Sequence, residues 1–395
     1  HVFHHAEVAV IGGGVSGISA ALEVLNNSKT ERVVLVDERE HLGGELFNEF
    51  STDDAASIWH KDSIEKLLSY MNEDNNRLTL LSRSTAYAWY DHNYIEVLET
   101  NATGESLVTK QDQTARKTIH KIRAKEVILA TGAHERPMLF ETNDLANIML
   151  SQSVRRYLNE FGVISGKDIV LYGNNDSIYS TAIDLNNKNI KSTVVDVRSS
   201  EVRSEMIAKA KGLGIKVFQG YAILKANGTH LVQSIELSQV VLQGKEWNVS
   251  GGSQQLKCDL LATSGGFNPV VHLDCHCGAK TFYNEVSQSF LPQKERNNRQ
   301  VCGSVAGVGA WQDAVSDAKN KAQLTLKSLG IVKKINQDKL STNYLNFFNV
   351  SQFFTPVEIL NRPKVFLDMQ NDVTTLDVAL SIKEGYRSIE HIKRY

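Results

Sequence analysis

The chain has 395 residues, 42% of them hydrophobic and 22% charged, so it is a globular chain long enough to bury two or three cores. Its formal net charge of −2 gives no general electrostatic reason to bind nucleic acid or an anionic membrane. No apolar run is long enough to cross a bilayer, and four cysteines do not make a disulfide framework in a chain of this size, which favours a reducing cytoplasm.

The first informative stretch combines a strand, a glycine turn, a helix and a second strand in immediate succession. Val8 to Ile11 is a short apolar run, and the turn after it reads Gly-Gly-Gly-Val-Ser-Gly over residues 12–17. A helical pattern follows, with apolar residues at spacings of three and four: Ile18, Ala21, Leu22 and Leu25. A β-branched strand from Arg32 to Val36 then ends on an acid. This order predicts a dinucleotide-binding unit.

Each residue type in this unit has a physical role in holding a dinucleotide. Gly12 allows a tight turn off the strand, Gly14 lets the backbone approach a pyrophosphate, and Gly17 lets the helix pack closely on the strand. The pyrophosphate then meets free N–H groups at the positive end of the helix dipole. Asp37, at the tip of the second strand, is placed to accept hydrogen bonds from the adenosine ribose. Its charge would repel a 2′-phosphate, which favours NAD or FAD over NADP.

The next segments complete the predicted first unit. The backbone of Glu45 to Phe47 is expected to pass near the cofactor, and Ile58 to Met71 has the spacing of a surface helix. Residues 78–81 and 84–90 are predicted to be strands. Gly104 to Arg116 is polar and is predicted to form a hairpin loop.

A second informative stretch, VILATGAHERP, runs from Val127 to Pro137. It is a buried strand that ends at Thr131 and Gly132, whose small size lets the backbone approach the cofactor before the chain crosses to a second domain. The charged residues that follow could serve as acid, base and anion clamp, or as a salt-bridged hinge, and we favour the hinge. These three residues are His134, Glu135 and Arg136.

The pattern of strand, turn, helix and strand repeats from Asp168 to Arg198, but its turn, residues 173–178, departs from the fingerprint. Asn175 stands where the close-approach glycine belongs, and Ile178 where a small residue would let the helix pack. Because a Cβ at position 175 obstructs a pyrophosphate, this second unit is not expected to bind a dinucleotide. Asp176 is predicted to cap the helix.

Four stretches in the last third of the chain carry further predictions. Residues 256–266 read as a buried strand that returns the chain to the first domain. Cys275-His276-Cys277 has no second ligand pair, so no zinc or iron–sulfur site is expected there. Val301 to Gly307 is typical of the last strand of a dinucleotide domain, and its glycine-rich turn and the helix at 312–322 are expected to face the cofactor. Thr374 to Asp377 has the pattern of a capping box.

Together these elements predict an α/β chain with two Rossmann-like, FAD/NAD(P)-binding domains, as in pyridine nucleotide-disulfide reductases, plus a small C-terminal helical region. The first domain is expected at 1–150 and 256–330, interrupted by a degenerate second domain at 151–255. A linker and the small helical domain are expected at 331–395. The chain begins at a histidine and ends within a helical pattern, so it is expected to be part of a longer polypeptide.

Several of these stretches together resemble the alpha subunit of heterotetrameric sarcosine oxidase. They span nearly the whole chain in the expected order, and the last is the most specific because general dinucleotide-domain proteins lack it. The matching segments are residues 12–44, 85–94, 127–137, 162–185, 264–273 and 365–395.

The resemblance implies a complex with beta, gamma and delta subunits that acts on the CH–NH group of sarcosine. Such a complex oxidises sarcosine to glycine with O2, producing hydrogen peroxide, and passes the one-carbon unit to tetrahydrofolate as 5,10-methylenetetrahydrofolate. It also implies FAD on the beta subunit, FMN at the alpha–beta interface, zinc on the smallest subunit and a tightly bound NAD in the alpha subunit. No metal site is expected in this chain, and the sequence identifies no catalytic residue.

The resemblance and the residue pattern place the dinucleotide site of this chain around the first glycine turn. The predicted cofactor-binding residues are Gly12, Gly14, Ser16, Gly17, Asp37, Glu38, Arg39, Gly44, Glu45, Ala86, Thr131, Gly132, Ala306, Gly307 and Trp311. The family's ferredoxin-like N-terminal domain and folate-binding C-terminal domain are not recognised in this chain, so it is not expected to bind folate itself. Residues 342–395 contain no cysteine, so the iron–sulfur cluster of related amine and opine oxidases is not expected there.

Two other classes of function remain open from the sequence. One is an FAD-dependent NAD(P)H oxidoreductase or an amine or opine dehydrogenase subunit, with FAD in the first unit. The substituted second turn and the lack of a CxxC pair disfavour the reductase. The other is a scaffold that binds nothing, which the intact turn from Gly12 to Gly17 disfavours.

Overall fold

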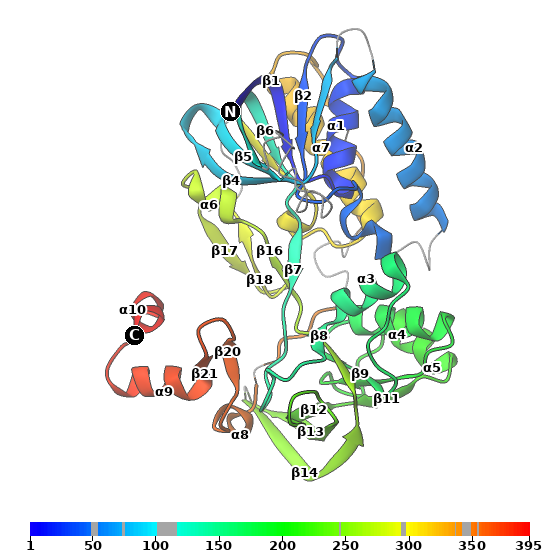
Figure 1. Ribbon diagram of the computed structural model, residues 1–395, viewed down its shortest axis with the longest axis vertical. Helices are drawn as coiled ribbons and strands as arrows, with labels where there is room; N and C mark the ends of the chain where they lie inside the picture. Colours follow the sequence, from blue (N-terminus) through cyan, green and yellow to red (C-terminus); the bar gives the residue numbers. More distant parts are fainter. Residues whose placement is uncertain are drawn as a thin grey trace, which may run out of the picture. The chain divides into compact units, whose positions relative to one another are not determined.

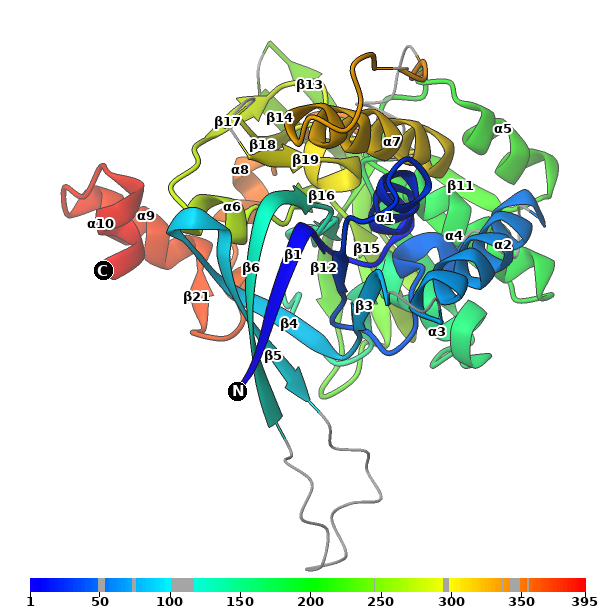
Figure 2. The same cartoon turned by 90° about the horizontal axis from the view of Figure 1, so that it is seen from above.

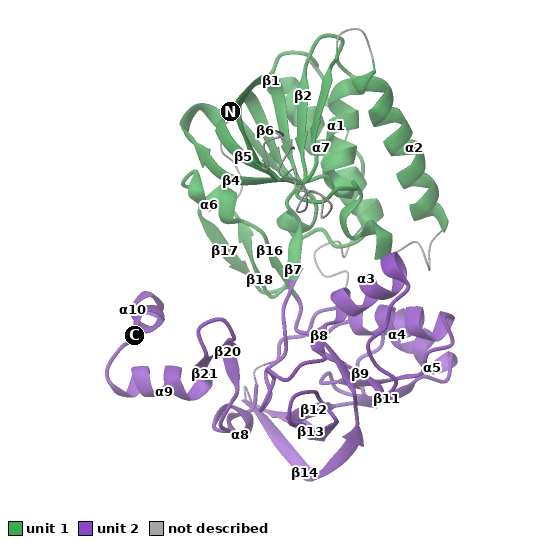
Figure 3. Ribbon diagram, viewed as in Figure 1, with its two compact units in different colours: residues 1–134, 267–347 green, residues 135–266, 348–395 purple. Residues whose placement is uncertain are grey.

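The computed structural model describes residues 1–48, 54–72, 76–100, 117–244, 246–293, 298–335, 337–341, 349–353 and 355–395. The chain divides into two compact units, which Figure 3 colours separately: unit 1 contains residues 1–134 and 267–347, and unit 2 contains residues 135–266 and 348–395. The polar loop predicted at 104–116 lies outside the described residues.

Unit 1 is built on a sheet with the strand order β3-β2-β1-β6-β5-β4, to which β19 adds beside β6. Five of these strands run parallel: β3, β2, β1, β6 and β19. Strands β4 and β5 form a hairpin, and β5 pairs antiparallel with β6. The bounds are β1 Val2–Ile11, β2 Val33–Val36, β3 Leu78–Leu81, β4 Ser84–Tyr90, β5 Tyr94–Thr100, β6 Lys117–Leu129 and β19 Arg299–Val301.

Both faces of this sheet are buried, which explains the continuous apolar run at its centre. Along β1, Val8 and Val10 join one core, while Ala9 and Ile11 point into another on the opposite face. Three helices cover the first face (Figure 1). They are α1 Val15–Asn26, α2 Asp54–Met71 and α7 Trp311–Ser328.

Helices α1 and α7 run side by side over the sheet (Figure 2). Small side chains allow this close packing, since alanines from both helices are fully buried in the shared core: Ala20, Ala21, Ala318 and Ala322. Short elements complete unit 1: η1 Gly44–Asn48, η2 Asp91–Asn93, α6 His272–His276, β17 Thr281–Asn284, β18 Ser289–Pro292 and η4 Gly303–Ala306.

Unit 2 repeats the architecture with a five-stranded parallel sheet in the order β11-β10-β9-β15-β8. Its strands are β8 Ile148–Leu150, β9 Ile169–Gly173, β10 Ser192–Asp196, β11 Lys216–Gln219 and β15 Leu260–Ser264. Its helices are α3 Ser151–Phe161, α4 Ser177–Asn187 and α5 Glu205–Gly212. An antiparallel sheet adds β12 Tyr221–Asn227, β13 Ser234–Gln243 and β14 Glu246–Lys257.

The strand β15 lies in unit 2, whereas the sequence pattern had assigned it to the first domain. It pairs with β9 and β8, and its two faces enter the two cores of unit 2 through Leu260 and Leu261. A strand buried on both faces carries no sign of which sheet it joins. The chain crosses between the units at β7 Ala133–Glu135 and β16 Phe267–Pro269, which pair with each other.

The C-terminal part of unit 2 is small and begins with α8 Val357–Leu360. The predicted capping box is confirmed: the Thr374 side chain accepts from the Asp377 N–H, and the Asp377 side chain accepts from the Thr374 N–H. The remaining elements are β20 Phe366–Asp368, β21 Val373–Thr374, α9 Thr375–Lys383 and α10 Ile389–Arg394. Across the described ranges, no helix combines the length and apolarity needed to cross a membrane.

Candidate dinucleotide-binding site

Two glycines of the first turn are required by the fold itself. Gly12 has a φ of +105°, and a Cβ there would lie 2.2 Å from the carbonyl oxygen of Ala130 on the neighbouring strand. A Cβ on Gly17 would lie 1.7 Å from the carbonyl oxygen of Gly12. Any side chain at these positions would therefore collide with backbone, as the sequence analysis expected for a tight turn and a close helix–strand contact.

Gly14 differs, because no atom of the described residues would crowd a Cβ at this position. Its φ of −74° suits any residue, and the nearest atom to an added Cβ is the Cα of Gly44, 3.9 Å away. Gly14 forms an isolated parallel β-bridge with Gly43, and the next residue, Gly44, has a φ of +58°. Packing among the described residues therefore does not require a glycine at position 14.

The start of helix α1 offers hydrogen-bond donors beside this turn. Gly14 is its N-cap residue, and no side chain caps the helix. The N–H groups of the first helical turn have no partner within an α-helix, and the helix dipole gives this end a partial positive charge. An uncapped helix start at a glycine that packing does not require fits a pyrophosphate group.

Asp37 is tied to the glycine turn by its carboxylate. Its Oδ2 accepts from the Gly13 N–H at 2.5 Å, and its Oδ1 accepts from the Arg39 N–H at 2.7 Å. Burial raises the pKa of the Asp37 carboxyl, although the hydrogen bonds from Arg39 and Gly13 act in the opposite direction. Each oxygen keeps a second lone pair that a ribose hydroxyl could use. The contact with Gly13 was missed by the sequence reasoning, which gave that residue no role.

The two other predicted residues near Asp37 bind each other. The Arg39 guanidinium forms an ion pair with Glu45 at 2.5 Å, and Asn48 donates to the second oxygen of Glu45 at 2.7 Å. Glu38 is exposed. The positive charge of Arg39 is therefore matched by a carboxylate from η1.

A second backbone segment closes on the start of α1 at Ser16. A Cβ on Gly303 would lie 2.0 Å from the Ser16 Oγ, and the Gly303 N–H donates to Asp317 Oδ2 at 2.8 Å. Gly303 opens η4, the turn that ends with the predicted Ala306 and Gly307. Burial raises the pKa of the Asp317 carboxyl. Gly303 and Asp317 were missed, because a glycine and a helical acid carry no pattern that links them across fourteen residues.

The remaining predicted residues contact other neighbours. Thr131 donates its hydroxyl to the Val270 carbonyl at 2.7 Å, and the Gly132 carbonyl accepts from the Val270 N–H at 3.0 Å. Trp311 opens α7, with its ring centroid 6.0 Å from that of Trp59. Ala86 is half-buried on β4. Their place in a dinucleotide site stays a prediction.

Of the charged residues in the predicted hinge, Glu135 is the most buried, at 8% exposure. Its carboxylate accepts from the Gln152 N–H at 2.7 Å and from the Ser177 hydroxyl at 3.2 Å. Glu135 therefore connects the first turn of α3 with the first residue of α4 inside unit 2. These contacts give it a structural role.

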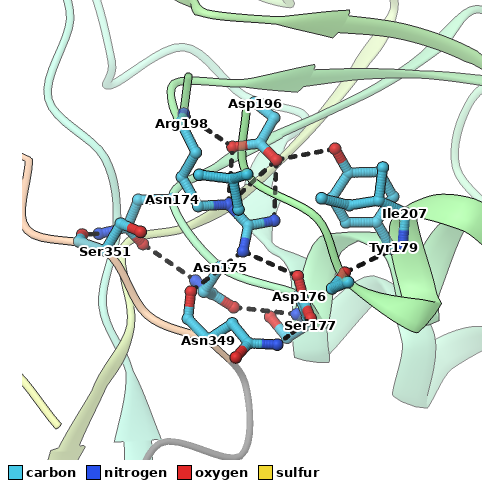
Figure 4. Close-up of polar contacts among 12 residues, drawn as sticks. Asn174, Asn175, Asp176, Ser177, Tyr179, Asp196, Arg198, Ile207, Asn349 and Ser351 are labelled. Atoms are coloured by element: carbon cyan, nitrogen blue, oxygen red, sulfur yellow. Dashed lines mark hydrogen bonds and ion pairs between the residues drawn. The ribbon is translucent and has the colours of Figure 1, made fainter. Parts of the chain in front are cut away.

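The second glycine turn is filled by its own side chains (Figure 4). Asn175 is fully buried and donates to the carbonyl and hydroxyl oxygens of Ser264 at 3.1 and 2.9 Å. Its amide oxygen accepts from the Ser177 N–H at 3.0 Å. The side chain predicted to obstruct a pyrophosphate thus takes up the first donor of helix α4.

The prediction that Asp176 is the N-cap residue of helix α4 is confirmed in position, but the Asp176 side chain does not cap the helix. Asp176 occupies the N-cap position, but its backbone is helical, with φ −76° and ψ −12°, and its side chain makes no capping hydrogen bond. An N-cap side chain reaches back to the helix only from an extended backbone. The Asp176 carboxylate instead pairs with Arg198 at 2.8 Å, and Asn175 supplies the cap (Figure 4).

Asp196 stands at the tip of β10, as Asp37 follows β2 in the first unit. It is fully buried, pairs with the Arg198 guanidinium at 2.8 Å and accepts from the Tyr179 hydroxyl at 2.7 Å. Burial raises the pKa of Tyr179, and the charge of Asp196 adds to that shift. Both oxygens of the Asp196 carboxylate are bound by protein groups, since Oδ1 accepts from the Arg198 N–H at 2.9 Å and Oδ2 accepts from the Tyr179 hydroxyl.

Among the described residues, no three His, Cys, Asp or Glu side chains lie close enough together to hold a metal ion. Cys275 and Cys277 flank the end of α6, and the pKa of the Cys275 thiol is raised by burial and by Asp274.

Comparison with known proteins now adds to this geometry. Residues 6–286 match the pyridine nucleotide-disulphide oxidoreductase family. The chain belongs to this family. Residues 362–395 match the sarcosine oxidase A3 domain. The fold is therefore that of proteins that bind a FAD or NAD(P) dinucleotide, as predicted.

Over its whole length this chain is similar to alpha subunits of sarcosine oxidase. It is 32% identical over 423 residues to that of Corynebacterium sp. (strain P-1) and 34% identical over 404 residues to that of strain U-96. Both alignments cover 100% of this chain and 40% of the relative, so the chain spans about two fifths of their length. These similarities confirm the resemblance found in the sequence.

A solved structure with a similar fold is the L-proline dehydrogenase of P. horikoshii, with a TM-score of 0.70 and 20% identity. That similarity covers 100% of this chain and 69% of the other.

Proposed function

We propose that this chain is the dinucleotide-holding part of a sarcosine oxidase alpha subunit, with a resident NAD at the first glycine turn. The observation that carries the proposal is the uncapped start of α1 at Gly14, a glycine that packing does not require, beside the Asp37 carboxylate. Similarity to sarcosine oxidase alpha subunits across the whole chain supports the same assignment.

Each group around the turn would have a defined task. The N–H groups at the start of α1 would bind the pyrophosphate, and Gly14 would let the backbone come within hydrogen-bonding distance. Asp37 would accept from the adenosine ribose hydroxyls. Asp37 carries negative charge and Arg39 is paired with Glu45, so neither side chain offers an unpaired positive charge to a 2′-phosphate. This arrangement supports NAD over NADP.

The nicotinamide of NAD supplies hydride-transfer chemistry where a donor can reach it. No catalytic residue is assigned to this chain, and we place the amine chemistry on a partner. The proposed complex contains beta, gamma and delta subunits, with FAD on the beta subunit and FMN at the alpha–beta interface. It would act on the CH–NH group of sarcosine with O2 and tetrahydrofolate, and yield glycine, hydrogen peroxide and 5,10-methylenetetrahydrofolate.

The cofactor assignment is tested by denaturing the purified chain and identifying the released molecule by absorbance and mass. We expect one NAD per chain. Released FAD would instead support an FAD-dependent NAD(P)H oxidoreductase or an amine or opine dehydrogenase subunit, and an empty protein would support a scaffold.

Two variants locate the site within the chain. Asp37→Ala should lose the dinucleotide, because it removes the ribose acceptor and the link to Gly13. Asn175→Ala, the corresponding change in the second unit, should keep it. Retention of NAD by Asp37→Ala would refute the assignment.

The assignment of the complex is tested by co-expressing the chain with beta, gamma and delta-type subunits. We expect co-purification and sarcosine-dependent oxygen uptake with hydrogen peroxide formation. Failure of the beta-type subunit to co-purify would separate this chain from that complex.

A further inference from the structure

A short segment near the C-terminal region, residues 349–351, lies against the second glycine turn (Figure 4). Asn174 and Ser351 bind each other twice: the Ser351 N–H donates to the Asn174 carbonyl at 3.0 Å, and the Asn174 side chain donates to the Ser351 carbonyl at 2.9 Å. These two hydrogen bonds, one from the Ser351 backbone and one from the Asn174 side chain, hold the segment at the first residue after β9.

The residue at the other end of the segment, Asn349, is held by charged groups. Its carbonyl accepts from the Arg198 guanidinium at 3.0 Å, and its side chain donates to the Asp176 carboxylate at 2.7 Å. Between them, Val350 lies 3.2 Å from where a Cβ on Gly266 would be. The segment therefore contacts residues that follow three neighbouring strands, β9, β10 and β15.

The carboxyl ends of parallel strands are where open α/β sheets bind their ligands. In unit 2 the positions of a dinucleotide's contacts are taken by protein groups. The carboxylate of Asp176 stands at the positive end of helix α4, where a pyrophosphate would lie. The acid at the strand tip, Asp196, is committed to Arg198 and Tyr179.

The charge of this cluster also opposes a phosphate ligand. Two carboxylates, Asp176 and Asp196, share the single guanidinium of Arg198. The Asp176 side chain is 5% exposed, and those of Asp196 and Arg198 are 0% exposed. Burial on its own would lower the pKa of Arg198, but hydrogen bonds and charge from Asp196 and Asp176 raise it. The guanidinium therefore stays charged, and the three groups sum to one negative charge.

We propose that the second Rossmann-like unit has exchanged its nucleotide for a peptide, and that residues 349–351 are the resident occupant of its crevice. The side chain of Asn349 takes a place near the helix start that a nucleotide would otherwise reach. The unit thereby anchors the chain where it enters the C-terminal region instead of admitting a second NAD(P)H.

The test uses the full chain and amide hydrogen exchange with two matched charge changes. Asn349→Asp removes the donor to Asp176 and places a third carboxylate against the cluster, so it should expel the segment. Gln352→Glu makes the same change from amide to carboxylate at the exposed residue that follows the segment. We expect exchange at residues 173–178 and at Ser351 to rise at least about tenfold in Asn349→Asp only.

A nucleotide arm completes the experiment, with NADH and NADPH as probes. Neither should slow exchange at residues 173–178 in the wild-type chain. Slowing by either nucleotide would overturn the proposal, and so would equal exchange in Asn349→Asp and Gln352→Glu. If Asn349→Asp does not fold, Asn349→Ala removes the hydrogen bond without the charge and should change exchange in the same direction by a smaller factor.

Discussion

At the scale of single residues, the first turn contains glycines that packing requires and one, Gly14, that packing does not require. A Cβ on Gly17 would lie 1.7 Å from the Gly12 carbonyl oxygen, whereas the nearest atom to a Cβ on Gly14 would be the Gly44 Cα at 3.9 Å. Both residues are glycines of the same sequence motif, so the motif alone does not distinguish them. The structure shows that their substitutions should have different consequences.

We therefore expect Gly17→Ala to lower the free energy of unfolding by about 1–3 kcal/mol, the usual cost of overpacking. Gly14→Ala should cost less, about 0.5–1 kcal/mol, because alanine is a poorer N-cap residue than glycine. Gly14→Ala should nevertheless lose NAD, since its methyl group enters the space beside the helix start. Chemical denaturation and the mass of the released cofactor check both values, and a Gly14→Ala chain with full NAD content would contradict the proposed pyrophosphate position.

The Asp37 carboxyl should make NAD retention depend on pH. Burial raises its pKa, so it becomes protonated at a higher pH than an ordinary aspartate, whose pKa is about 3.9. The ribose contact needs the ionised form, and NAD should be lost as the pH falls through this raised pKa. In the chain without NAD the sign is reversed: the contribution of Asp37 to stability is present below its unfolded pKa and is lost as the pH rises through the folded value.

The measurement is bound NAD after gel filtration at a series of acidic pH values. Asp37→Asn is the control, because it cannot ionise, and its residual binding should not follow the same curve. An identical pH profile in the wild type and Asp37→Asn would show that another group controls release.

At the scale of elements, the cluster at the end of β10 stabilises the second unit through a buried network. Removing Arg198 would leave Asp176 and Asp196 buried without their cation, and breaking a buried pair in this way costs about 3–5 kcal/mol. Arg198→Met should lower the free energy of unfolding by about that amount without changing the NAD content of unit 1. Denaturant unfolding monitors the first quantity and released NAD the second.

Asp176→Asn offers the matched control for that experiment. It keeps the volume of the side chain and leaves Asp196 paired with Arg198, so it should destabilise far less than Arg198→Met. Equal losses in the two variants would show that the carboxylate of Asp176, rather than the shared guanidinium, dominates the network.

Local patterns predicted the elements well, and long-range choices were not predictable. The strand, glycine turn and helix around Gly14 follow from residues that are neighbours in the sequence, and so does the capping box at Thr374. The role of the Asp176 side chain could not be predicted, because its carboxylate pairs with Arg198, which lies beyond the next strand. The sequence around Asn349 does not indicate a contact with Asp176, 173 residues earlier.

At the scale of the whole molecule, the two units share an architecture but differ at the turn that follows the first strand of each dinucleotide-binding pattern. In unit 1 the turn beside Gly14 is open, and in unit 2 the equivalent turn is filled by Asn175 and covered by residues 349–351. If both units were nucleotide sites, reduced NAD(P)H could deliver electrons to this chain directly. We infer one dinucleotide per chain and a dependence on partners for chemistry.

This inference gives a prediction for the isolated chain. Sarcosine added to the chain alone should not reduce its bound NAD, because no group for amine oxidation is assigned to it. The same addition to the co-expressed complex should consume oxygen. The absorbance of reduced nicotinamide and an oxygen electrode provide the readouts, and reduction of NAD in the isolated chain would move the amine site onto this polypeptide.

The shared guanidinium of Arg198 has an evolutionary consequence. Restoring a nucleotide to unit 2 would require changes at Asn175, Asp176, Asp196, Arg198 and the covering segment, and each of the first four is fully or almost fully buried. A chain that reverses only one of them leaves an uncompensated charge or an unsatisfied donor in its interior. Single substitutions toward a nucleotide site in unit 2 would therefore lower the stability of the fold, and selection for stability would oppose each of them.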